Sequence, residues 1–261
     1  MVPAMGKVTF PKIGNKETYS PLFSARHLMK GKEHIPKKVL LVYSRRMPAK
    51  LRRVMGLRSF KHSAGDTGAY HFKKFISKDR RLFVMMIPGG APITATAVEE
   101  AIACGGRQFL IAGTAGAINL DLNISDIVLC DSAIRDDGTS HHYLRNSKHV
   151  GPDKNLYGAL RKGMIRMDIP FVEGTTWTID APYAETRKEI RHYRNEGVLT
   201  VEMEAAALFA VAKKRKVRAA AAFTISDILG KEWSGFAKEH HKSGLMKLAL
   251  IAKIFKDART I

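Results

Sequence analysis

Cysteine and long apolar runs are scarce in this chain. Its only two cysteines, Cys104 and Cys130, lack the spacing of a metal site, and we interpret them as reduced packing residues rather than a disulfide. No run of about 18 apolar residues occurs, so no membrane-spanning helix is expected. The N-terminal segment lacks the apolar core of a secretory signal peptide, and the sequence therefore predicts a cytoplasmic protein.

Acidic residues are also in short supply. The chain has 24 Asp and Glu against 44 Lys and Arg, which gives a formal net charge of +20 at pH 7. Such a charge attracts polyanions, including nucleic acids and phosphorylated metabolites. The basic residues are spread over many segments, however, and no nucleic-acid-binding signature with interleaved aromatic residues is present. We therefore interpret most of the positive charge as solvated surface, and nucleic acid is not an expected partner.

The 261 residues divide into a short polar segment and one large domain. Residues 1–36 are punctuated by proline and glycine and predict an N-terminal arm or a small cap. From residue 37 to residue 261, strand and helix patterns alternate without repeats or low-complexity linkers. This alternation predicts a single α/β domain with a mixed central sheet.

The positions of the expected elements follow from the periodicity of apolar residues. We expect strands over residues 37–44, 107–113, 125–134, 170–179, 198–203 and 217–226, and a hairpin formed by 68–77 and 80–87. We expect helices over 48–56, 91–104, 154–167, 183–195 and 204–215, and a last helix from about 234 to 256.

Carboxylates stand at the ends of two apolar runs. Glu202 and Glu204 flank Met203 where a short strand gives way to a helix, and Asp227 closes the second run. Buried charge is costly unless something pairs with it, and ligand sites in open α/β sheets lie at the carboxyl ends of strands. The pattern therefore predicts a site for a polyhydroxylated, protonatable ligand. For Glu202 the alternative, a residue that only caps a helix, stays open.

Three further positions are candidates for ligand contacts. Gly90 lies in a strand-to-helix turn that suits an anion or a sugar, although a plain turn explains it equally well. Thr114 offers a hydroxyl at the end of another strand, where it would reach a phosphate. Trp177 would stack on a nucleobase or serve as a core residue, and the sequence leaves both interpretations open.

The histidines do not indicate a metal site. His141 and His142 are adjacent, as are His240 and His241, so the side chains of each pair diverge. The first pair lies in RDDGTSHHYL, a cluster rich in hydrogen-bonding groups. No Ser-His-Asp or catalytic cysteine arrangement follows from the spacing, and no metal is expected.

Four segments together resemble the nucleoside phosphorylase/nucleosidase superfamily. They are GGAPITATAVEEAIACGGRQFLIAGTAGAI, SDIVLCDSAIRDDGTSHHY, VEMEAAALFAVA and TISD, and they run in order through roughly half the chain. That superfamily includes purine nucleoside and uridine phosphorylases and the methylthioadenosine and AMP nucleosidases. The resemblance implies a three-layer α/β/α fold and a homo-oligomer, a dimer or a hexamer, in which a neighbouring subunit often completes the site.

The resemblance also implies roles for the acidic segments. Met203 and Glu204 would hold the ribose, with Glu204 accepting hydrogen bonds from its 2′- and 3′-hydroxyls. Asp227, with Ser226 beside it, matches the acid that protonates or hydrogen-bonds a purine N7, which favours a purine base. Gly90 matches the loop beside the sugar.

The phosphate-binding residues of the superfamily are matched less well. Thr114 matches a hydroxyl that contacts phosphate or the sugar. The phosphorylases carry a phosphate-binding arginine where this chain has Ile111. Their N-terminal phosphate loop, Gly-Asp-Pro followed by an arginine, corresponds here to VYSRRMPAK, in which Ser44, Arg45 and Arg46 are the candidates.

The expected activity is cleavage of the N-glycosidic bond of a purine nucleoside. Inorganic phosphate would be the nucleophile and co-substrate, and no bound cofactor is expected. A nucleosidase of the same fold, acting with water on a nucleoside or nucleotide, is the close alternative, because the family arginine is missing. A protein that binds such a ligand without cleaving it is the second alternative.

Overall fold

The computed structural model describes residues 21–60, 72–145, 147–235 and 241–258. Most of the N-terminal arm expected over residues 1–36, and the first part of the expected hairpin (68–71), lie outside these ranges. The described end of the arm holds helix α1 (Ala25–Leu28) and packs on the domain. Met29 and Ile35 are buried there, and the Ile35 amide donates to the Cys104 carbonyl at 2.9 Å. A division of the chain at residue 36 stays a prediction.

The sheet is mixed, as expected. Its strands are β1 (Lys38–Val42), β2 (Arg58–Ser59), β3 (Lys73–Ile76), β4 (Leu82–Met86), β5 (Gln108–Ala117), β6 (Ile127–Asp136), β7 (His149–Val150), β8 (Val172–Ile179), β9 (Thr200–Glu202), β10 (Arg218–Leu229) and β11 (Trp233–Gly235). Strand β1 lies parallel between β4 and β5, and β5 is also parallel to β10. Strands β3 and β4 form the expected antiparallel hairpin.

One end of the sheet closes on itself. Strand β5 pairs with both β10 and β9, β10 pairs with β6, and β6 continues through β8 back to β9. Strands β5, β10, β6, β8 and β9 therefore form a ring, while β1, β4, β3 and β2 extend as an open sheet.

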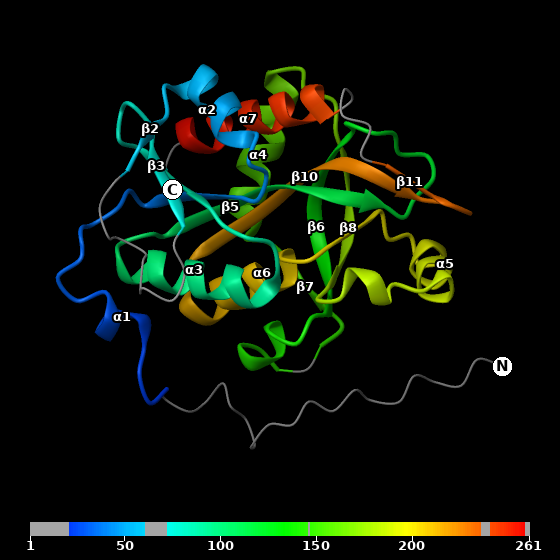
Figure 1. The fold of residues 1–261 in the computed structure, drawn as a ribbon, viewed down its shortest axis with the longest axis horizontal. Helices are drawn as coiled ribbons and strands as arrows, with labels where there is room; N and C mark the ends of the chain where they lie inside the picture. The colour runs from blue at the N-terminus through cyan, green and yellow to red at the C-terminus, as the bar shows by residue number, and fades with distance from the viewer. Residues whose placement is uncertain (1–20, 61–71, 146, 236–240, 259–261) are drawn as a thin grey trace.

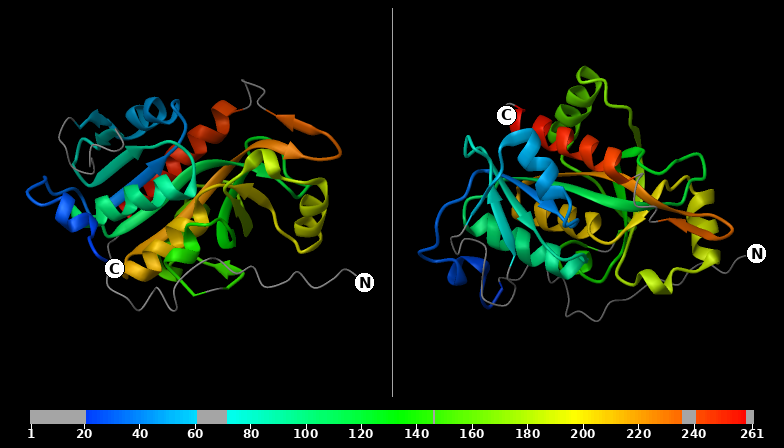
Figure 2. Two further views of the ribbon diagram at one scale, coloured as in Figure 1. Left: turned by 60° about the horizontal axis from the view of Figure 1, so that its bottom comes forward. Right: turned by 45° about the horizontal axis from the view of Figure 1, so that its top comes forward.

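Helices cover both faces of the sheet, which confirms the three-layer fold (Figure 1). Helices α2 (Met47–Met55), α4 (Lys154–Arg166) and α7 (His241–Asp257) lie on one face, and α3 (Ala91–Ala103) and α6 (Ala205–Arg215) on the other. Helix α5 (Arg187–Asn195) lies beside the ring, away from both layers (Figure 2). Alternate residues of the strands face opposite layers: Leu40 and Val42 pack toward α2 and α7, whereas Val39 and Leu41 pack toward α3 and α6.

Two helices differ from the sequence expectation, and the short strands β2 and β7 are not among the expected elements. Helix α5 begins at Arg187 rather than at residue 183, because the side chain of Thr186 accepts a hydrogen bond from the Glu189 amide and fixes the start of the helix. The last helix does not begin near residue 234. Residues Trp233–Gly235 form strand β11, which pairs antiparallel with the end of β10, and α7 begins at His241.

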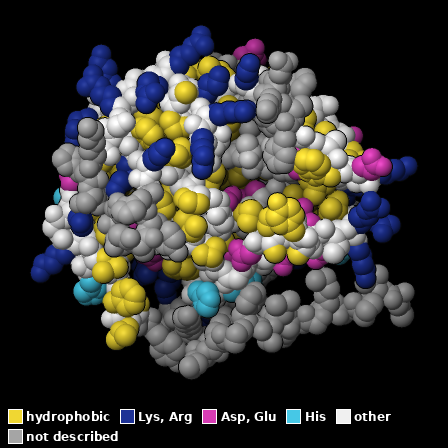
Figure 3. All heavy atoms as spheres, in the orientation of Figure 1, with side chains coloured by type: hydrophobic (Ala, Val, Ile, Leu, Met, Phe, Trp, Pro, Cys, Tyr) yellow, Lys and Arg dark blue, Asp and Glu magenta, His cyan; other side chains and the backbone are white. Residues whose placement is uncertain are grey.

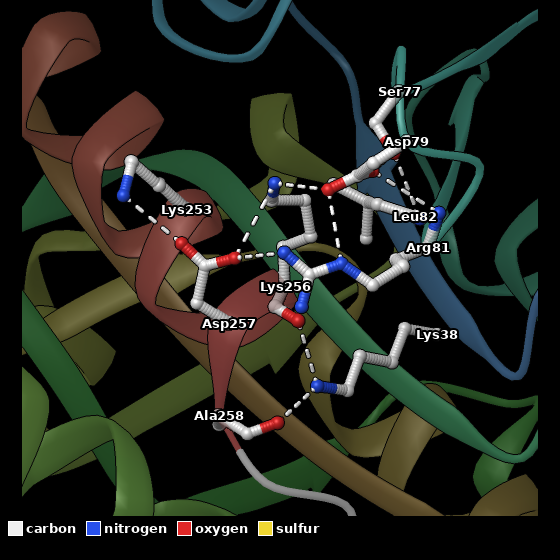
Figure 4. Close-up of polar contacts among 9 residues, drawn as sticks. All are labelled: Lys38, Ser77, Asp79, Arg81, Leu82, Lys253, Lys256, Asp257 and Ala258. Atoms are coloured by element: carbon white, nitrogen blue, oxygen red, sulfur yellow. Dashed lines mark hydrogen bonds and ion pairs between the residues drawn. The ribbon is translucent and has the colours of Figure 1, made fainter.

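A polar cluster fastens the end of α7 to the sheet (Figure 4). The buried ammonium of Lys38, on β1, donates to the backbone carbonyls of Lys256 at 2.8 Å and Ala258 at 2.5 Å. Asp79, in the turn between β3 and β4, accepts hydrogen bonds from Lys256 and Arg81. The carbonyls at the end of α7 therefore have donors, and the helix is held at the edge opposite the carboxyl ends of the parallel strands.

Close packing of α4 against α7 depends on Gly163. A Cβ atom at that position would lie 2.2 Å from Cγ2 of Ile254, whereas a Cβ at Gly158 on the same helix would meet no atom within 4 Å. We expect Gly163→Ala to lower the free energy of unfolding by about 1–3 kcal/mol through overpacking. Gly158→Ala should raise it by about 0.5–1 kcal/mol because alanine favours the helix. Urea unfolding of both variants would measure this, and equal shifts would contradict it.

Candidate active site

The two acidic segments meet at one point of the central strand β5. Gly116 pairs with Val201 of β9 on one side and with Asp227 of β10 on the other. Glu202 follows Val201 directly, so the carboxylates expected to act together do lie at the same end of the sheet. Figure 3 shows several acidic side chains near the middle of one face, while most Lys and Arg side chains lie over its upper part and along its sides.

A β-bulge aims the side chain of Asp227. The pairing of β10 with β5 skips Ser226, since Ile225 pairs with Ala115 and Asp227 with Gly116. Such a bulge rotates the following side chain relative to the regular alternation. The Ser226 hydroxyl then donates to Oδ1 of Asp227 at 2.6 Å, and the indole N–H of Trp233 donates to Oδ2 at 3.0 Å. Both oxygens of Asp227 are thereby fixed in direction.

Glu202 anchors the start of helix α6. Its Oε2 accepts hydrogen bonds from the amides of Glu204 and Ala205, both at 2.8 Å, and its Oε1 accepts one from the Thr178 hydroxyl at 2.5 Å. The Thr178 oxygen in turn accepts from the Ala206 amide at 3.1 Å. These contacts supply acceptors for the free N–H groups of the first helical turn. The structure thus favours the helix-capping interpretation of Glu202, with a positioning role in the site.

Glu204 is held from the opposite direction by the glycine turn after β4. The amide of Gly90 donates to its Oε1 at 2.6 Å, and Gly90 has φ of +115°, a conformation that other residues rarely adopt. A Cβ at Gly89 would lie 3.2 Å from the same oxygen. Met203 is half-buried between the two glutamates. The structure therefore brings Gly90, Met203 and Glu204 together, as the sequence predicted.

Burial changes the acid–base properties of the two glutamates. Only 5% of Glu202 and 7% of Glu204 is exposed. Loss of solvent raises the pKa of Glu202 and of Glu204 above the ordinary value, and the charge of Glu204 adds to the rise at Glu202. The hydrogen bonds from the backbone lower the pKa of both glutamates, but by less than burial raises it. Since the two groups interact, they titrate as a pair.

The cluster RDDGTSHHYL borders the same end of the sheet. The Gly138 amide donates to Asp180, at the end of β8, at 2.8 Å, and the Ser140 amide donates to the fully buried Asp137 at 2.6 Å. Asp180 is close enough to add to the rise in the pKa of Glu204. The cluster therefore closes the acidic site on the side of β6 and β8.

Trp177 lies in the core rather than on the site. Its exposed fraction is 0%, its ring packs 4.6 Å from that of Tyr193, and its indole N–H donates to Asp136 at 2.9 Å. A side chain without exposed surface does not stack on a bound base in this conformation. The structure therefore favours the core interpretation, and we omit Trp177 from the proposed site.

The expected phosphate ligands lie beside the site, with no direct link to its carboxylates. Thr114 is exposed on β5, and Arg45 and Arg46 are exposed between β1 and α2. The half-buried Ser44 accepts a hydrogen bond from the Arg46 amide at 3.3 Å. Ile111, at the position for which the family resemblance implies an arginine, is fully buried in the core beneath α3 and α6. Its side chain has no access to a ligand.

Two negative observations concern the described residues only. Within residues 21–60, 72–145, 147–235 and 241–258, no three His, Cys, Asp or Glu side chains are grouped so that they would hold a metal ion. No helix in these ranges is long and apolar enough to cross a membrane.

The sequence did not indicate three positioning residues. Trp233 directly precedes the expected last helix, and the sequence gives it no role, so its contact with Asp227 is not expected, although an aromatic residue shortly after a strand is compatible with a hairpin. The other two residues lie at the end of β8, a strand from which the sequence indicated only Trp177. Thr178 donates a hydrogen bond to Glu202, and Asp180 accepts one from the Gly138 amide.

A helix-anchoring role for Glu202 predicts a specific loss of stability. Glu202→Ala removes the acceptor of the Glu204 and Ala205 amides and of the Thr178 hydroxyl. Glu204→Ala removes the acceptor of the Gly90 and Met203 amides. Since each buried unsatisfied group costs about 1–3 kcal/mol, we expect Glu202→Ala to lower the free energy of unfolding by about 1–3 kcal/mol more than Glu204→Ala. Urea unfolding would measure the difference, and equal losses would refute the anchoring role.

Glu185 predicts a pH dependence of stability. Burial, together with the charges of Asp227 and Glu189, raises the pKa of Glu185 to about 7. The folded state therefore keeps a proton that the unfolded chain loses near its ordinary pKa of 4.5, so this contribution to stability is complete below that pH and is lost as the pH rises to about 7.

Glu185→Gln should flatten that part of the stability profile, as measured by thermal unfolding across this pH range. The exposed carboxylate of Glu232 supplies the control. If Glu232→Gln and Glu185→Gln give the same profile, the burial of Glu185 is not the cause.

Sequence comparison identifies relatives over most of the chain. The family model described as the phosphorylase superfamily matches residues 44–256. Guanosine phosphorylase of Halorubrum lacusprofundi is 32% identical over 136 residues, which cover 52% of this chain and 56% of the relative. A DeoD-type purine nucleoside phosphorylase of Exiguobacterium is 30% identical over 192 residues, which cover 71% of this chain and 77% of the relative. The chain thus spans little more than half the length of the first relative.

Solved structures show the same fold. Purine nucleoside phosphorylase of Toxoplasma gondii superimposes with a TM-score of 0.74 at 16% identity, covering 86% of this chain and 91% of that one. Uridine phosphorylase of Vibrio fischeri ES114 gives a TM-score of 0.73 at 19% identity, with coverage of 86% and 91%. The family match over residues 44–256 establishes what the sequence resemblance predicted: the chain belongs to the phosphorylase superfamily.

Proposed function

We propose that this protein is a nucleoside phosphorylase that cleaves the N-glycosidic bond of a purine nucleoside with inorganic phosphate. The observation that supports the proposal is the convergence of the two acidic segments on Gly116 of β5, which pairs with Val201, three residues before Glu204, and with Asp227. Family membership and the named activities of the relatives support the reaction class.

The sugar is proposed to lie against Glu204. The Gly90 amide holds Oε1 of this carboxylate, which orients the group so that Oε2 accepts hydrogen bonds from the 2′- and 3′-hydroxyls. Met203 and Gly90 would pack beside the ribose. As the glycosidic bond breaks, positive charge develops on the sugar, and a nearby carboxylate stabilises it.

The base is proposed to lie against Asp227. The electron pair of the broken bond passes to the purine, and a proton or a hydrogen bond at N7 from Asp227 would relieve the negative charge that develops there. Ser226 and Trp233 each donate to this carboxylate and so fix its direction. We assign them positioning roles, with Ser226 close to the substrate.

The phosphate is proposed to approach the sugar from the side of Thr114. Its exposed hydroxyl, together with Ser44 and the guanidinium groups of Arg45 and Arg46, would supply hydrogen bonds and positive charge. The anion would attack the anomeric carbon, and ribose 1-phosphate and the free base would be released. No bound cofactor takes part in this scheme.

Hydrolysis is a second candidate because of Ile111. The position that carries a phosphate-binding arginine in the phosphorylases is here a fully buried apolar residue. With water as the nucleophile, the same carboxylates would release free ribose. We further expect a cytoplasmic homo-oligomer, a dimer or a hexamer, which sedimentation of the purified chain would test.

A panel of purine and pyrimidine nucleosides, incubated with and without inorganic phosphate, tests the reaction. We expect base release from purines that requires phosphate and yields ribose 1-phosphate. Equal release without phosphate would establish the hydrolase. Absence of release from nucleosides and from nucleotides would contradict both, and would leave a binding protein.

The role of Asp227 is tested separately. Asp227→Asn should lower kcat/KM on a purine nucleoside by about 10²–10⁴-fold, since it removes proton transfer to the base. The exposed Asp121 supplies the matched control, and Asp121→Asn should keep the parental rate. Full activity of Asp227→Asn would show that another group acts on the base.

A further inference from the structure

One helix layer carries an unusual excess of positive charge. Helices α2, α4 and α7, which we call the basic helix layer, contain eleven Lys and Arg residues and a single acidic residue, Asp257. Half of the formal net charge of +20 therefore resides in three helices.

The fold gathers residues that are far apart in the sequence. Helix α7 packs against both α2 and α4, so the three form one continuous layer over the sheet (Figure 1). The right view of Figure 2, in which this layer is turned forward, shows the same arrangement. This is why the basic residues look dispersed along the chain although they share one face of the folded protein.

Several of these cations already have partners. Arg161 forms an ion pair with Glu173 at 2.8 Å, and Lys253 and Lys256 pair with Asp257 and Asp79 in the cluster of Figure 4. Among the residues that the structure describes, no ion pair involves the remaining cations of these three helices, Lys247 left aside. These cations are half-buried or exposed, and they are Lys50, Arg52, Arg53, Lys154, Lys162, Arg166 and Lys242. Unneutralised charge therefore remains on all three helices.

The opposite helix layer has a different composition. Helix α3 contains Glu99 and Glu100 and no basic residue, and the three cations of α6 fall in its last turn. One of them, Arg215, pairs with Glu99 at 2.7 Å. The charge of the basic helix layer is therefore a property of one face and not of helices throughout the molecule.

We propose that the basic helix layer binds the phosphate backbone of duplex nucleic acid without reading its base sequence. Phosphate contacts by Lys and Arg supply most of the affinity of such binding, and the planar guanidinium groups of Arg52 and Arg53 match phosphate oxygens in geometry. Helix α7 has 17 residues and so extends over about 25 Å, enough to follow several phosphates spaced about 3.4 Å apart.

The composition of the basic helix layer favours a nucleic-acid duplex over a single strand and over an anionic membrane surface. Proteins that bind single strands stack bases on exposed aromatic side chains, and an anionic membrane surface is held in part by apolar residues that insert. Among the described residues of the three helices, Ile165 is the only large hydrophobic side chain that is strongly exposed. The face is charged without a stacking or inserting group.

Two charge-matched variants of the full chain test the proposal. The first combines Arg52→Gln, Arg53→Gln, Lys154→Gln and Lys162→Gln on the basic helix layer. The control combines Arg187→Gln, Lys188→Gln, Arg191→Gln and Lys213→Gln, all exposed on α5 and α6. Each variant replaces two Arg and two Lys residues, so both lose the same net charge. In each variant one of the four replaced residues is the first residue of a helix, Lys154 of α4 or Arg187 of α5.

Binding to a labelled mixed-sequence DNA duplex would be followed by fluorescence anisotropy at several salt concentrations. We expect the parent and the control to bind with steep salt dependence, and the layer variant to bind at least about tenfold more weakly, with the slope of log K against log salt reduced by as much as about 3 to 4. Thermal unfolding and nucleoside cleavage should be unchanged, which excludes misfolding.

Three results would overturn the proposal. Equal weakening of both variants would show that net charge alone drives binding. Tighter binding of the parent to single-stranded DNA than to the duplex would assign the face to single strands. Binding to phosphatidylserine vesicles without binding to DNA would assign it to a membrane surface.

Discussion

Strand β5 is the constraint on which the site depends. Its residue Gly116 pairs with Val201 of β9 and with Asp227 of β10 at the same time, so two acidic segments from different parts of the chain end at one place. Little space is left for a side chain there, because a Cβ atom would lie 2.5 Å from Cδ1 of Leu229 and 3.1 Å from an oxygen of Asp227. The strand pairing that closes the ring therefore also brings the acidic segments together.

The carboxylates of the site are stabilised by neutral donors instead of cations. Although the chain has 44 Lys and Arg, the hydrogen bonds to Glu202, Glu204 and Asp227 among the described residues come from backbone amides, hydroxyls and an indole. Neutral donors orient a carboxylate without cancelling its charge. An ionised carboxylate of the site therefore keeps its full charge, which suits a reaction that builds positive charge on a sugar.

The alternation of strand and helix patterns was sufficient to predict an α/β domain with a mixed sheet, and the family resemblance supplied the three layers. Leu40 and Val42 face one helix layer and Val39 and Leu41 the other, as a period of two requires. The run VEMEAAAL likewise indicated a strand, a turn and a helix. The bulge at Ser226 was not predictable, because it depends on the register between β10 and β5, which are distant in sequence. The exposure of Trp233 and the complete burial of Trp177 were not predictable either, because the exposure of a side chain depends on residues that are distant in sequence.

The hairpin of β10 and β11 gives Asp227 an unusual dependence on the backbone. Asp227 pairs with Gly235 across the hairpin, and Trp233 of the same short strand donates to its carboxylate. A carboxylate that is oriented by the strand beside it changes direction whenever that strand shifts. In the proposed complex, the angle at which Asp227 meets the base would therefore depend on the length and twist of a two-stranded ribbon, so that an insertion or deletion in the ribbon would change base selectivity while every proposed contact residue is kept.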